Sequence, residues 1–315
     1  GCSLNDDFSD KYLYVTTYPI EYATNMMYSD YAKISSVYPN GSKSDYKVTE
    51  KKKDKYATGE LFIYSGVSGE AYLAKDLYNR NDNLGLIDAT KGMNRELENE
   101  SIWLNPSNYL MLCSNIKSGL IEYNDNVYVK EKIEDNYKKL NEMISELDVN
   151  LYDIGKNGNY NTILTTNDIF NYLTKYNINV ISIDENNKTI DKSYAEAEKL
   201  VKSKDIQYVY YLEDDELNER QEKFISENSI VKVPIKSMFT ITEEEKNELK
   251  SLIDDYINKT QMDMVILTDS VPYTNDNTND TYASDFYDYN DFGINFKNYS
   301  GVILFRNTYE ENPYF

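Results

Sequence analysis

The chain has 315 residues, of which 40% are hydrophobic and 14% aromatic, and this composition is typical of a globular protein rather than a disordered one. Its formal net charge of −21 disfavours nucleic acid and anionic lipid head groups as partners, because both carry the same sign of charge. It contains 32 tyrosines but no histidine, which excludes both an imidazole metal ligand and an imidazole acid–base catalyst.

The first residues indicate a lipid anchor. A glycine and a cysteine, Gly1 and Cys2, are followed at once by polar sequence, as in a bacterial lipoprotein whose signal ends at Gly1 and whose Cys2 is acylated. Two acyl chains hold a protein at a membrane where one is marginal, since each buried methylene contributes about 0.8 kcal/mol. We therefore expect residues 1–10 to be a tether and the protein to be extracytoplasmic, attached to the cell membrane only through this anchor.

Residues 11–126 alternate short β-rich runs with helical patterns, which predicts βαβ units and a parallel sheet. Strands are expected at 12–17, 34–38, 61–64 and 84–88, with a polar loop between the second and third of these. Helices are expected after Pro19 and over 70–79. Asn105-Pro106 is a capping side chain followed by a proline at the first helical position, which predicts a further helix start.

A long helix is predicted next. Ile133, Tyr137, Leu140, Ile144 and Leu147 recur at spacings of four and three, which is a sustained apolar stripe. Glycines at 155 and 158 are expected to end this helix. It separates the first α/β pattern from a second one.

The second pattern predicts strands at 162–165, 179–183, 206–212 and 230–233, and helices at 168–176, 193–203, 216–227 and from 242 to about 258. The predicted fold class is α/β, with two lobes, each holding a small, mostly parallel sheet flanked by helices, joined by one long rigid helix. The expected boundaries are an N-terminal lobe at 11–126, the connecting helix at 127–155, a C-terminal lobe at 156–260 and a divergent extension at 261–315.

Several short segments, in this order, resemble the metal-type solute-binding lipoproteins of ABC transporters, the receptors for zinc and manganese. They are residues 15–19 (VTTYP), 60–66 (ELFIYSG), 102–106 (IWLNP), 115–120 (NIKSGL) and 165–170 (TTNDIF). The resemblance covers roughly residues 11 to 260 and leaves the last 55 residues outside it. It implies an ABC permease of the metal-uptake type as partner.

Members of that family usually hold the metal with three histidines and a carboxylate in the cleft between the lobes. Here the positions matching the histidines are Ser44 or Asp45, then Ser101, then Asn167, and the carboxylate position falls on Leu212 or Glu213; a later aspartate used by some members matches Val233. The candidate ligand-binding set that the resemblance implies is Asp45, Ser101, Asn167 and Glu213.

This set offers only oxygen atoms, which is a poor zinc site, because zinc in proteins is usually held by imidazole or thiolate. Calcium or magnesium accept oxygen ligands but normally require more of them. Three alternatives for the role of this site remain open. The chain binds a metal ion at the position of the family's metal site, or it binds a small solute through hydrogen bonds and tyrosine faces, or it is a scaffold that has lost ligand binding. Tyr18, Tyr46, Tyr210 and Tyr211 lie near the expected cleft. We assign no metal ligands and no cofactor.

No motif for catalysis is present, since the chain has no phosphate-binding glycine loop, no nucleophile elbow and no histidine to pair with a serine or cysteine. We therefore predict a non-enzymatic receptor, an extracytoplasmic solute-binding lipoprotein of an ABC importer with a degenerate metal site. The alternative is a non-transporting surface lipoprotein with an interaction or scaffold role. In this alternative the 261–315 tail occupies the old cleft, meaning the cleft between the lobes in which the family holds its metal.

Overall fold

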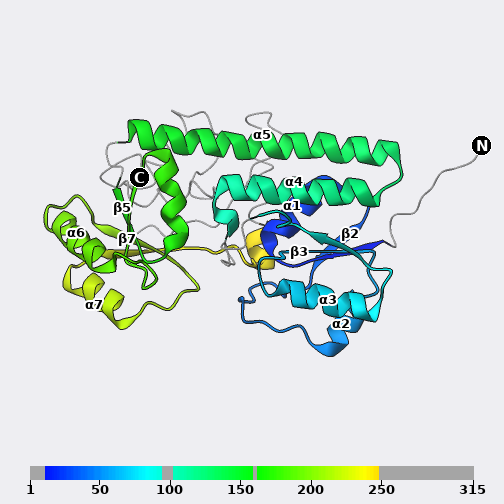
Figure 1. Cartoon of the computed structure of the whole chain (residues 1–315), viewed down its shortest axis with the longest axis horizontal. Coiled ribbons are helices and arrows are strands. Elements are labelled where there is room, and N and C mark those ends of the chain that lie inside the picture. Colours follow the sequence, from blue (N-terminus) through cyan, green and yellow to red (C-terminus); the bar gives the residue numbers. More distant parts are fainter. Residues whose placement is uncertain (1–10, 94–101, 159–161, 248–315) are drawn as a thin grey trace, which may run out of the picture. The chain divides into compact units, whose positions relative to one another are not determined.

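The computed structural model describes residues 11–93, 102–158 and 162–247 and divides them into two compact units (Figure 1). The first unit takes the described residues up to Trp103 together with Ser107–Glu142 and Met238–Glu243. The second takes Leu104–Pro106, Met143–Ser237 and the described residues from Glu244 onward. The chain therefore returns to the first unit after it has built the sheet of the second. Cys2 and the 261–315 extension lie outside the described residues.

The first unit holds a four-stranded, entirely parallel sheet in the order β2-β1-β3-β4. Its strands are β1 (Tyr12–Val15), β2 (Lys33–Ser36), β3 (Leu61–Tyr64) and β4 (Gly85–Asp88). Its helices are α1 (Tyr18–Tyr28), α2 (Glu50–Tyr56), α3 (Glu70–Arg80) and α4 (Pro106–Tyr123), with a short 3-10 turn η2 (Ile102–Leu104) before α4. The central strands β1 and β3 are the most buried, as expected of a parallel sheet covered by helices on its faces.

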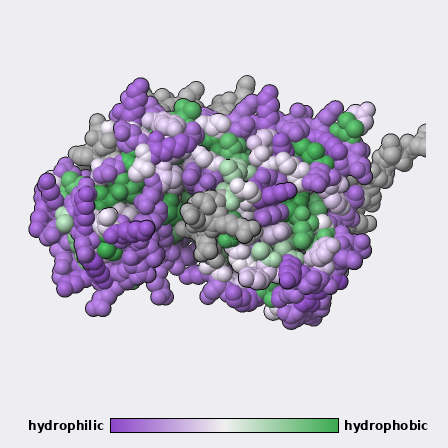
Figure 2. Space-filling view, viewed as in Figure 1, coloured by the Kyte–Doolittle hydropathy of each residue, from purple (hydrophilic) through white to green (hydrophobic). Residues whose placement is uncertain are grey.

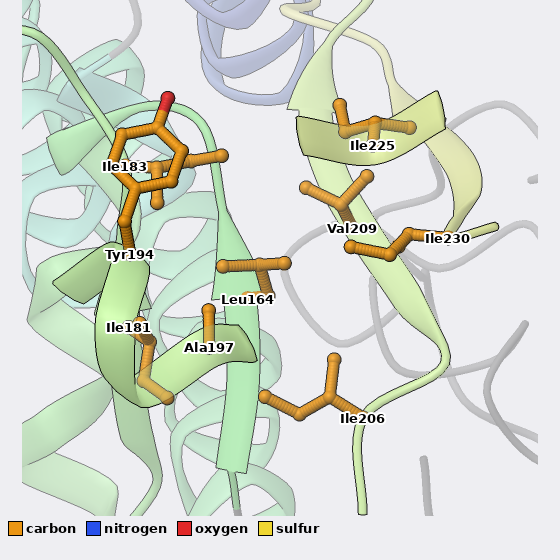
Figure 3. Packing of buried hydrophobic residues seen from close by; sticks show 9 residues of the cluster. All are labelled: Leu164, Ile181, Ile183, Tyr194, Ala197, Ile206, Val209, Ile225 and Ile230. Atoms are coloured by element: carbon orange, nitrogen blue, oxygen red, sulfur yellow. The ribbon is translucent and has the colours of Figure 1, made fainter. Parts of the chain in front are cut away.

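The second unit repeats this arrangement with a parallel sheet in the order β6-β5-β7-β8. Its strands are β5 (Thr162–Thr165), β6 (Asn179–Ser182), β7 (Tyr208–Leu212) and β8 (Val231–Ile235). They alternate with η3 (Asp168–Tyr176), α6 (Ile190–Lys202) and α7 (Glu219–Glu227). Figure 3 shows the core, in which Leu164 of β5 and Val209 of β7 pack with Ala197 of α6 and Ile225 of α7. The predicted fold class is confirmed.

Both sheets carry the same strand order, in which the chain first adds a strand on one side of the initial strand and then crosses to its other side. Because all the strands of each sheet are parallel, the loops after β1 and β3, and those after β5 and β7, leave at its carboxyl edge, on either side of the point where the strand order reverses. This switch point is the usual ligand-binding position of open parallel α/β sheets. The topology therefore directs attention to the loops at these two edges.

A single 31-residue helix, α5 (Val127–Asn157), contributes to both units. The predicted stripe is buried at Ile133, Leu140, Ile144 and Leu147, and half-buried at Tyr137. In the first unit, Lys117 of α4 lies 3.5 Å from Glu134 of α5, and its ammonium group lies 4.8 Å from the Tyr137 ring centre. The apolar period of the sequence therefore located this helix correctly.

The prediction of a polar loop between the second and third strands is wrong, because this segment contains helix α2. The segment has only one buried side chain, Tyr56, so it lacks an apolar period. Instead, the Thr49 side chain caps the helix by accepting a hydrogen bond from the Lys52 amide. Lys53 and Arg80 then tie α2 to α3 through ion pairs, with Lys53 2.6 Å from Asp76 and Arg80 2.5 Å from Asp54.

Several helix boundaries also differ from the prediction. The long helix passes through Gly155 to Asn157, α6 begins at Ile190 rather than at 193, and α7 begins at Glu219 rather than at 216. The start of α7 is decided by a capping box, in which Asn218 and Gln221 exchange side-chain and backbone hydrogen bonds. Residues 168–176 are helical as predicted, but as a 3-10 helix.

The surface is strongly polar. In the view of Figure 2, hydrophilic residues cover most of the described surface. Within residues 11–93, 102–158 and 162–247, no helix combines the length and the apolar character needed to cross a bilayer.

We predict that Gly155→Ala destabilises the second unit. A β-carbon at this position would lie 1.6 Å from the Tyr176 carbonyl oxygen, so the end of η3 would have to move away from α5. The strain should lower the free energy of unfolding by about 1–3 kcal/mol, although alanine is intrinsically better in a helix than glycine by roughly 1 kcal/mol. Urea denaturation followed by circular dichroism measures the change.

Gly69→Ala is the matched control, since a β-carbon at Gly69 meets no atom within 4 Å. We expect this variant to unfold like the wild type. Equal or greater stability of Gly155→Ala would contradict the close packing of α5 against η3.

Candidate functional site

Asn167 follows β5 and caps the 3-10 helix η3. Its side-chain oxygen accepts a hydrogen bond from the Ile169 amide at 2.8 Å, and its amide group donates to Asp215 at 2.8 Å. Asp215 lies beyond the end of β7, the strand that pairs with β5. Asn167 therefore uses both polar groups to hold two neighbouring loops together, which is a structural role.

The other polar side chains at this edge also bond to one another. Ser182 donates to Asp168 at 2.6 Å, and the Asp168 amide donates to Asp184 at 2.8 Å. Gln221 is only 5% exposed, and its side-chain amide donates to the Thr166 and Ile183 carbonyl oxygens at 3.3 and 2.9 Å. No local sequence pattern predicts this network, because its residues come from separate loops and helices of the second unit. The network holds the carboxyl edge of the second sheet in place.

The remaining candidates are placed as follows. Glu213 is exposed in the turn after β7, and its amide donates to the Ile235 carbonyl oxygen at 2.8 Å. Asp45 is exposed in the loop between β2 and α2 of the first unit, and Ser101 lies outside the described residues. Leu212 and Val233, the other positions considered, are buried in strands. Within the second unit, Asn167 and Glu213 follow adjacent strands, but Asn167 bonds to Asp215.

A pocket of about 400 Å³ lies entirely within the first unit. This volume is within the roughly 300–1,000 Å³ typical of small-molecule sites. The loop after β2, the turn after β3 and the start of α3 all contribute to it. Its lining consists of Tyr38, Ser44, Tyr46, Lys47, Val48, Lys53, Ser65, Ser68, Gly69, Glu70, Tyr72, Leu73, Asp76, Trp103 and Phe239. The predicted Asp45 is flanked by two of these residues.

Aromatic rings form one part of the pocket. Tyr38 stacks on Phe239 with ring centres 4.8 Å apart, and Tyr46 meets Tyr38 edge-on at 6.2 Å. Phe239 reaches this position because residues 238–243 return to the first unit, where the Tyr18 amide donates to the Phe239 carbonyl oxygen at 2.9 Å. The prediction placed this residue in the C-terminal lobe. Nothing in the local sequence pattern indicated its contact with Tyr38.

A buried carboxylate forms another part. Glu70 opens α3 and is 6% exposed. Its carboxylate accepts hydrogen bonds from the Ser65 amide at 2.7 Å and from the Tyr38 hydroxyl at 3.4 Å. The positive end of the helix dipole favours a negative charge at this place. The pocket therefore contains a buried, hydrogen-bonded carboxyl group beside aromatic rings.

The half-buried cation of the pocket is already engaged. Lys53 lies 2.6 Å from Asp76 and 3.0 Å from Glu50. The hydrogen bond from Lys53 holds the pKa of Asp76 below its ordinary value, and the bonds to Asp76 and Glu50 raise the pKa of Lys53. Both partners are therefore charged at neutral pH. The second cation in the lining, Lys47, is exposed.

Buried hydroxyl groups occur after the first strand of each sheet. Thr16 and Thr17 follow β1, and Thr166 follows β5; in the described part of the chain their hydroxyl oxygens are buried without a hydrogen-bond partner. A buried polar atom left unpaired costs about 1–3 kcal/mol. These hydroxyls lie at the carboxyl edges where parallel α/β sheets bind ligands, so each could receive a polar atom of a solute.

Two further observations concern metal binding and nucleophilic chemistry. Within the described residues, no three acidic or thiol side chains are grouped closely enough to hold a metal ion. Cys113 is fully buried, and this burial raises the pKa of its thiol, so it is not a nucleophile.

A family model described as "Zinc-uptake complex component A periplasmic" matches residues 13–268. No curated protein sequence matches the chain.

Solved structures share the fold at low sequence identity. The Zn(II)-bound ZnuA-like domain of Streptococcus pneumoniae AdcA is 20% identical, with a TM-score of 0.59 over 76% of this chain and 91% of that one. The metal-dependent lipoprotein YcdH from Bacillus subtilis is 18% identical, with a TM-score of 0.61 over 77% and 92%. The laminin-binding protein Lbp of Streptococcus pyogenes is 15% identical, with a TM-score of 0.58 over 74% and 90%.

We predict that Asn167→Ala lowers the free energy of unfolding by about 1 kcal/mol, the usual cost of losing a helix cap. Asn167→Ser should retain most of the stability, because a serine hydroxyl can accept the same hydrogen bond from the Ile169 amide. Urea denaturation measures both. Glu213→Ala is the control, and we expect a change within about 0.5 kcal/mol, since this side chain is exposed. An Asn167→Ala variant as stable as the wild type would show that Asn167 does not act as a cap.

Proposed function

We propose that this chain, which belongs to the family of the periplasmic zinc-uptake complex component A, is an extracytoplasmic solute-binding receptor that serves an ABC permease of the metal-uptake type. The match over residues 13–268 carries this proposal, because it includes both parallel sheets and the helix α5. The buried, unpaired hydroxyls at the carboxyl edges support a role in binding. A receptor requires no catalytic group, and we propose that the chain is not an enzyme.

We further propose that its metal site is degenerate. A zinc site is built mainly from imidazole and thiolate, but the chain has no histidine and its Cys113 is buried. The four positions implied by resemblance, Asp45, Ser101, Asn167 and Glu213, supply only oxygen atoms. Asn167 is moreover engaged as a helix cap. The solute that this receptor carries is therefore not a transition ion held in the manner of the histidine-containing members.

Native mass spectrometry with elemental analysis tests this proposal on protein purified without chelator. We expect a retained organic molecule, because a receptor without nitrogen ligands must hold its solute by hydrogen bonds and ring contacts. Zinc and manganese should be far below one atom per chain.

One zinc or manganese atom per chain would refute the degenerate site while leaving the receptor function intact. A chain that carries neither a metal nor an organic molecule, even after incubation with an extract of growth medium, would contradict the receptor function. It would favour the non-transporting surface lipoprotein in which the 261–315 tail occupies the old cleft.

We also propose that Cys2 is acylated and attaches the protein to the membrane. Cys2→Ala should move the protein from the membrane fraction to the aqueous extracytoplasmic fraction, since the two acyl chains provide the attachment. Immunoblotting of the separated fractions measures this. Cys113→Ala is the matched control, because Cys113 is buried inside the first unit and its loss should leave the protein with the membrane. A Cys2→Ala variant that stays in the membrane fraction would rule out the anchor.

A further inference from the structure

We propose that one end of the first unit lies against the membrane surface and contacts zwitterionic lipid head groups through exposed tyrosines. The surface consists of Tyr12, Tyr123, Val127 and Tyr128, and we call it the tyrosine surface. This proposal rests on the acylation of Cys2 proposed above, and it adds a second contact with the membrane to that anchor.

The exposed apolar side chains of the first unit are unevenly distributed. Among its described residues, eight large hydrophobic side chains are exposed, and two of them, Tyr72 and Met111, lie in the first halves of α3 and α4, near the carboxyl edge of the sheet. The other six lie toward the opposite, amino edge: Tyr12, Tyr78, Leu86, Tyr123, Val127 and Tyr128. Exposed apolar side chains gathered in this way indicate an interaction surface.

Hydrogen bonds connect the end of α4 to the start of β1. Tyr123, the last residue of α4, donates from its hydroxyl to the Glu60 carboxylate, and the Glu60 amide donates to the Tyr12 carbonyl oxygen at 2.8 Å. Val127 and Tyr128 are 62% and 81% exposed and begin α5 directly after the turn that follows α4 (Figure 1). The four residues of the tyrosine surface therefore lie at one end of the first unit.

The proposed anchor joins the fold at this same end. β1 begins at Tyr12, one residue after Lys11, whose carbonyl oxygen accepts from the Lys33 amide at 2.8 Å. From Cys2 to Lys11 the chain spans at most about 30 Å, at roughly 3.3–3.6 Å per residue. An acylated Cys2 therefore keeps the tyrosine surface within this distance of the bilayer.

Such an anchor makes a weak contact sufficient. A short tether raises the effective concentration of the attached group to about the millimolar range. Tyrosine suits the contact, since it joins an apolar ring to a polar hydroxyl and is enriched where membranes meet water. The tyrosine surface can thus touch the bilayer in the anchored protein, although it would not recruit a free chain.

The charges around the surface favour neutral lipid. Asp30, Glu60 and Asp125 are exposed at this end and would repel anionic head groups. The Lys33 ammonium is also exposed and lies 5.4 Å from the Tyr12 ring centre. Zwitterionic head groups present both signs of charge to such a mixed surface without a net repulsion.

A second copy of the chain is the other candidate occupant. Self-association through the tyrosine surface would bring the Glu60 and Asp125 side chains of both copies together. The formal net charge of −21 on each copy opposes this approach as well. The membrane is therefore the better partner, and the test below includes the second copy as an outcome.

Fluorescence of vesicle-bound protein tests the proposal. The full chain is coupled through Cys2 to a maleimide-bearing phospholipid in phosphatidylcholine vesicles, and Cys113 does not compete for the reagent because it is fully buried. Tyr128→Trp supplies the probe, and the unsubstituted chain gives the background of its one tryptophan, Trp103. We expect phosphatidylcholine that is brominated near the head group to quench the emission of Tyr128→Trp, and the emission to shift to shorter wavelength.

Tyr72→Trp is the matched control, because Tyr72 is equally exposed, at 81%, but lies near the carboxyl edge of the same sheet. We expect its emission to be unchanged. Val127→Ser, combined with Tyr128→Trp, should reduce the quenching, since it removes an apolar contact. Addition of phosphatidylglycerol to the vesicles should reduce it too, because of the acidic side chains. Circular dichroism checks that each variant is folded.

Absence of quenching in Tyr128→Trp would refute the proposal, and equal quenching in Tyr72→Trp would show that the contact is not specific to the tyrosine surface. Stronger quenching with phosphatidylglycerol would overturn the zwitterionic partner. A dimer that forms in solution without vesicles and is lost in Tyr128→Ser would assign the surface to a second copy instead. The coupling is chemical, so these results do not depend on natural acylation, which the fractionation of Cys2→Ala decides separately.

Discussion

The first strand of each sheet, β1 or β5, pairs in parallel with two neighbouring strands. The rest of this structure depends on that constraint. Because β1 pairs in parallel with both β2 and β3, the loops that follow these strands must leave the sheet at the same edge. Tyr38, Ser65 and Glu70 belong to those loops or to the helix that follows them. Their contacts are thus a consequence of topology, and the second sheet places Asn167, Asp168 and Asp184 at one edge in the same way.

The family architecture is compatible with a chain that contains no histidine, because the packing of both units rests on other residues. The cores consist of aliphatic and aromatic side chains from strands and helices, such as Leu164, Val209 and Ile225 in the second unit. Ligand positions lie on loops, where substitution changes chemistry without disturbing packing. The loops of the second unit are instead stabilised by side-chain hydrogen bonds that use the available carboxylates and amides, as Gln221 and Asn167 show.

The apolar period of the sequence predicts some elements of the fold and not others. The strands and the long helix were correctly predicted, since apolar residues recur there with a clear period. Helix α2 was missed, because its stability comes from the Thr49 cap and from ion pairs with α3 rather than from an apolar face. The start of α7 was misplaced for the same kind of reason, since the capping box of Asn218 and Gln221 sets it.

The sequence alone determined the two α/β patterns, the family resemblance and the absence of imidazole, because composition and periodicity are local properties of the chain. Only the tertiary structure decided which polar side chains meet. It showed that Asn167 is a cap bonded to Asp215, and that Phe239 returns from beyond β8 to stack on Tyr38. Such contacts join residues far apart in the chain. They depend on strand order and on the return of residues 238–243, neither of which leaves a periodic signal in the sequence.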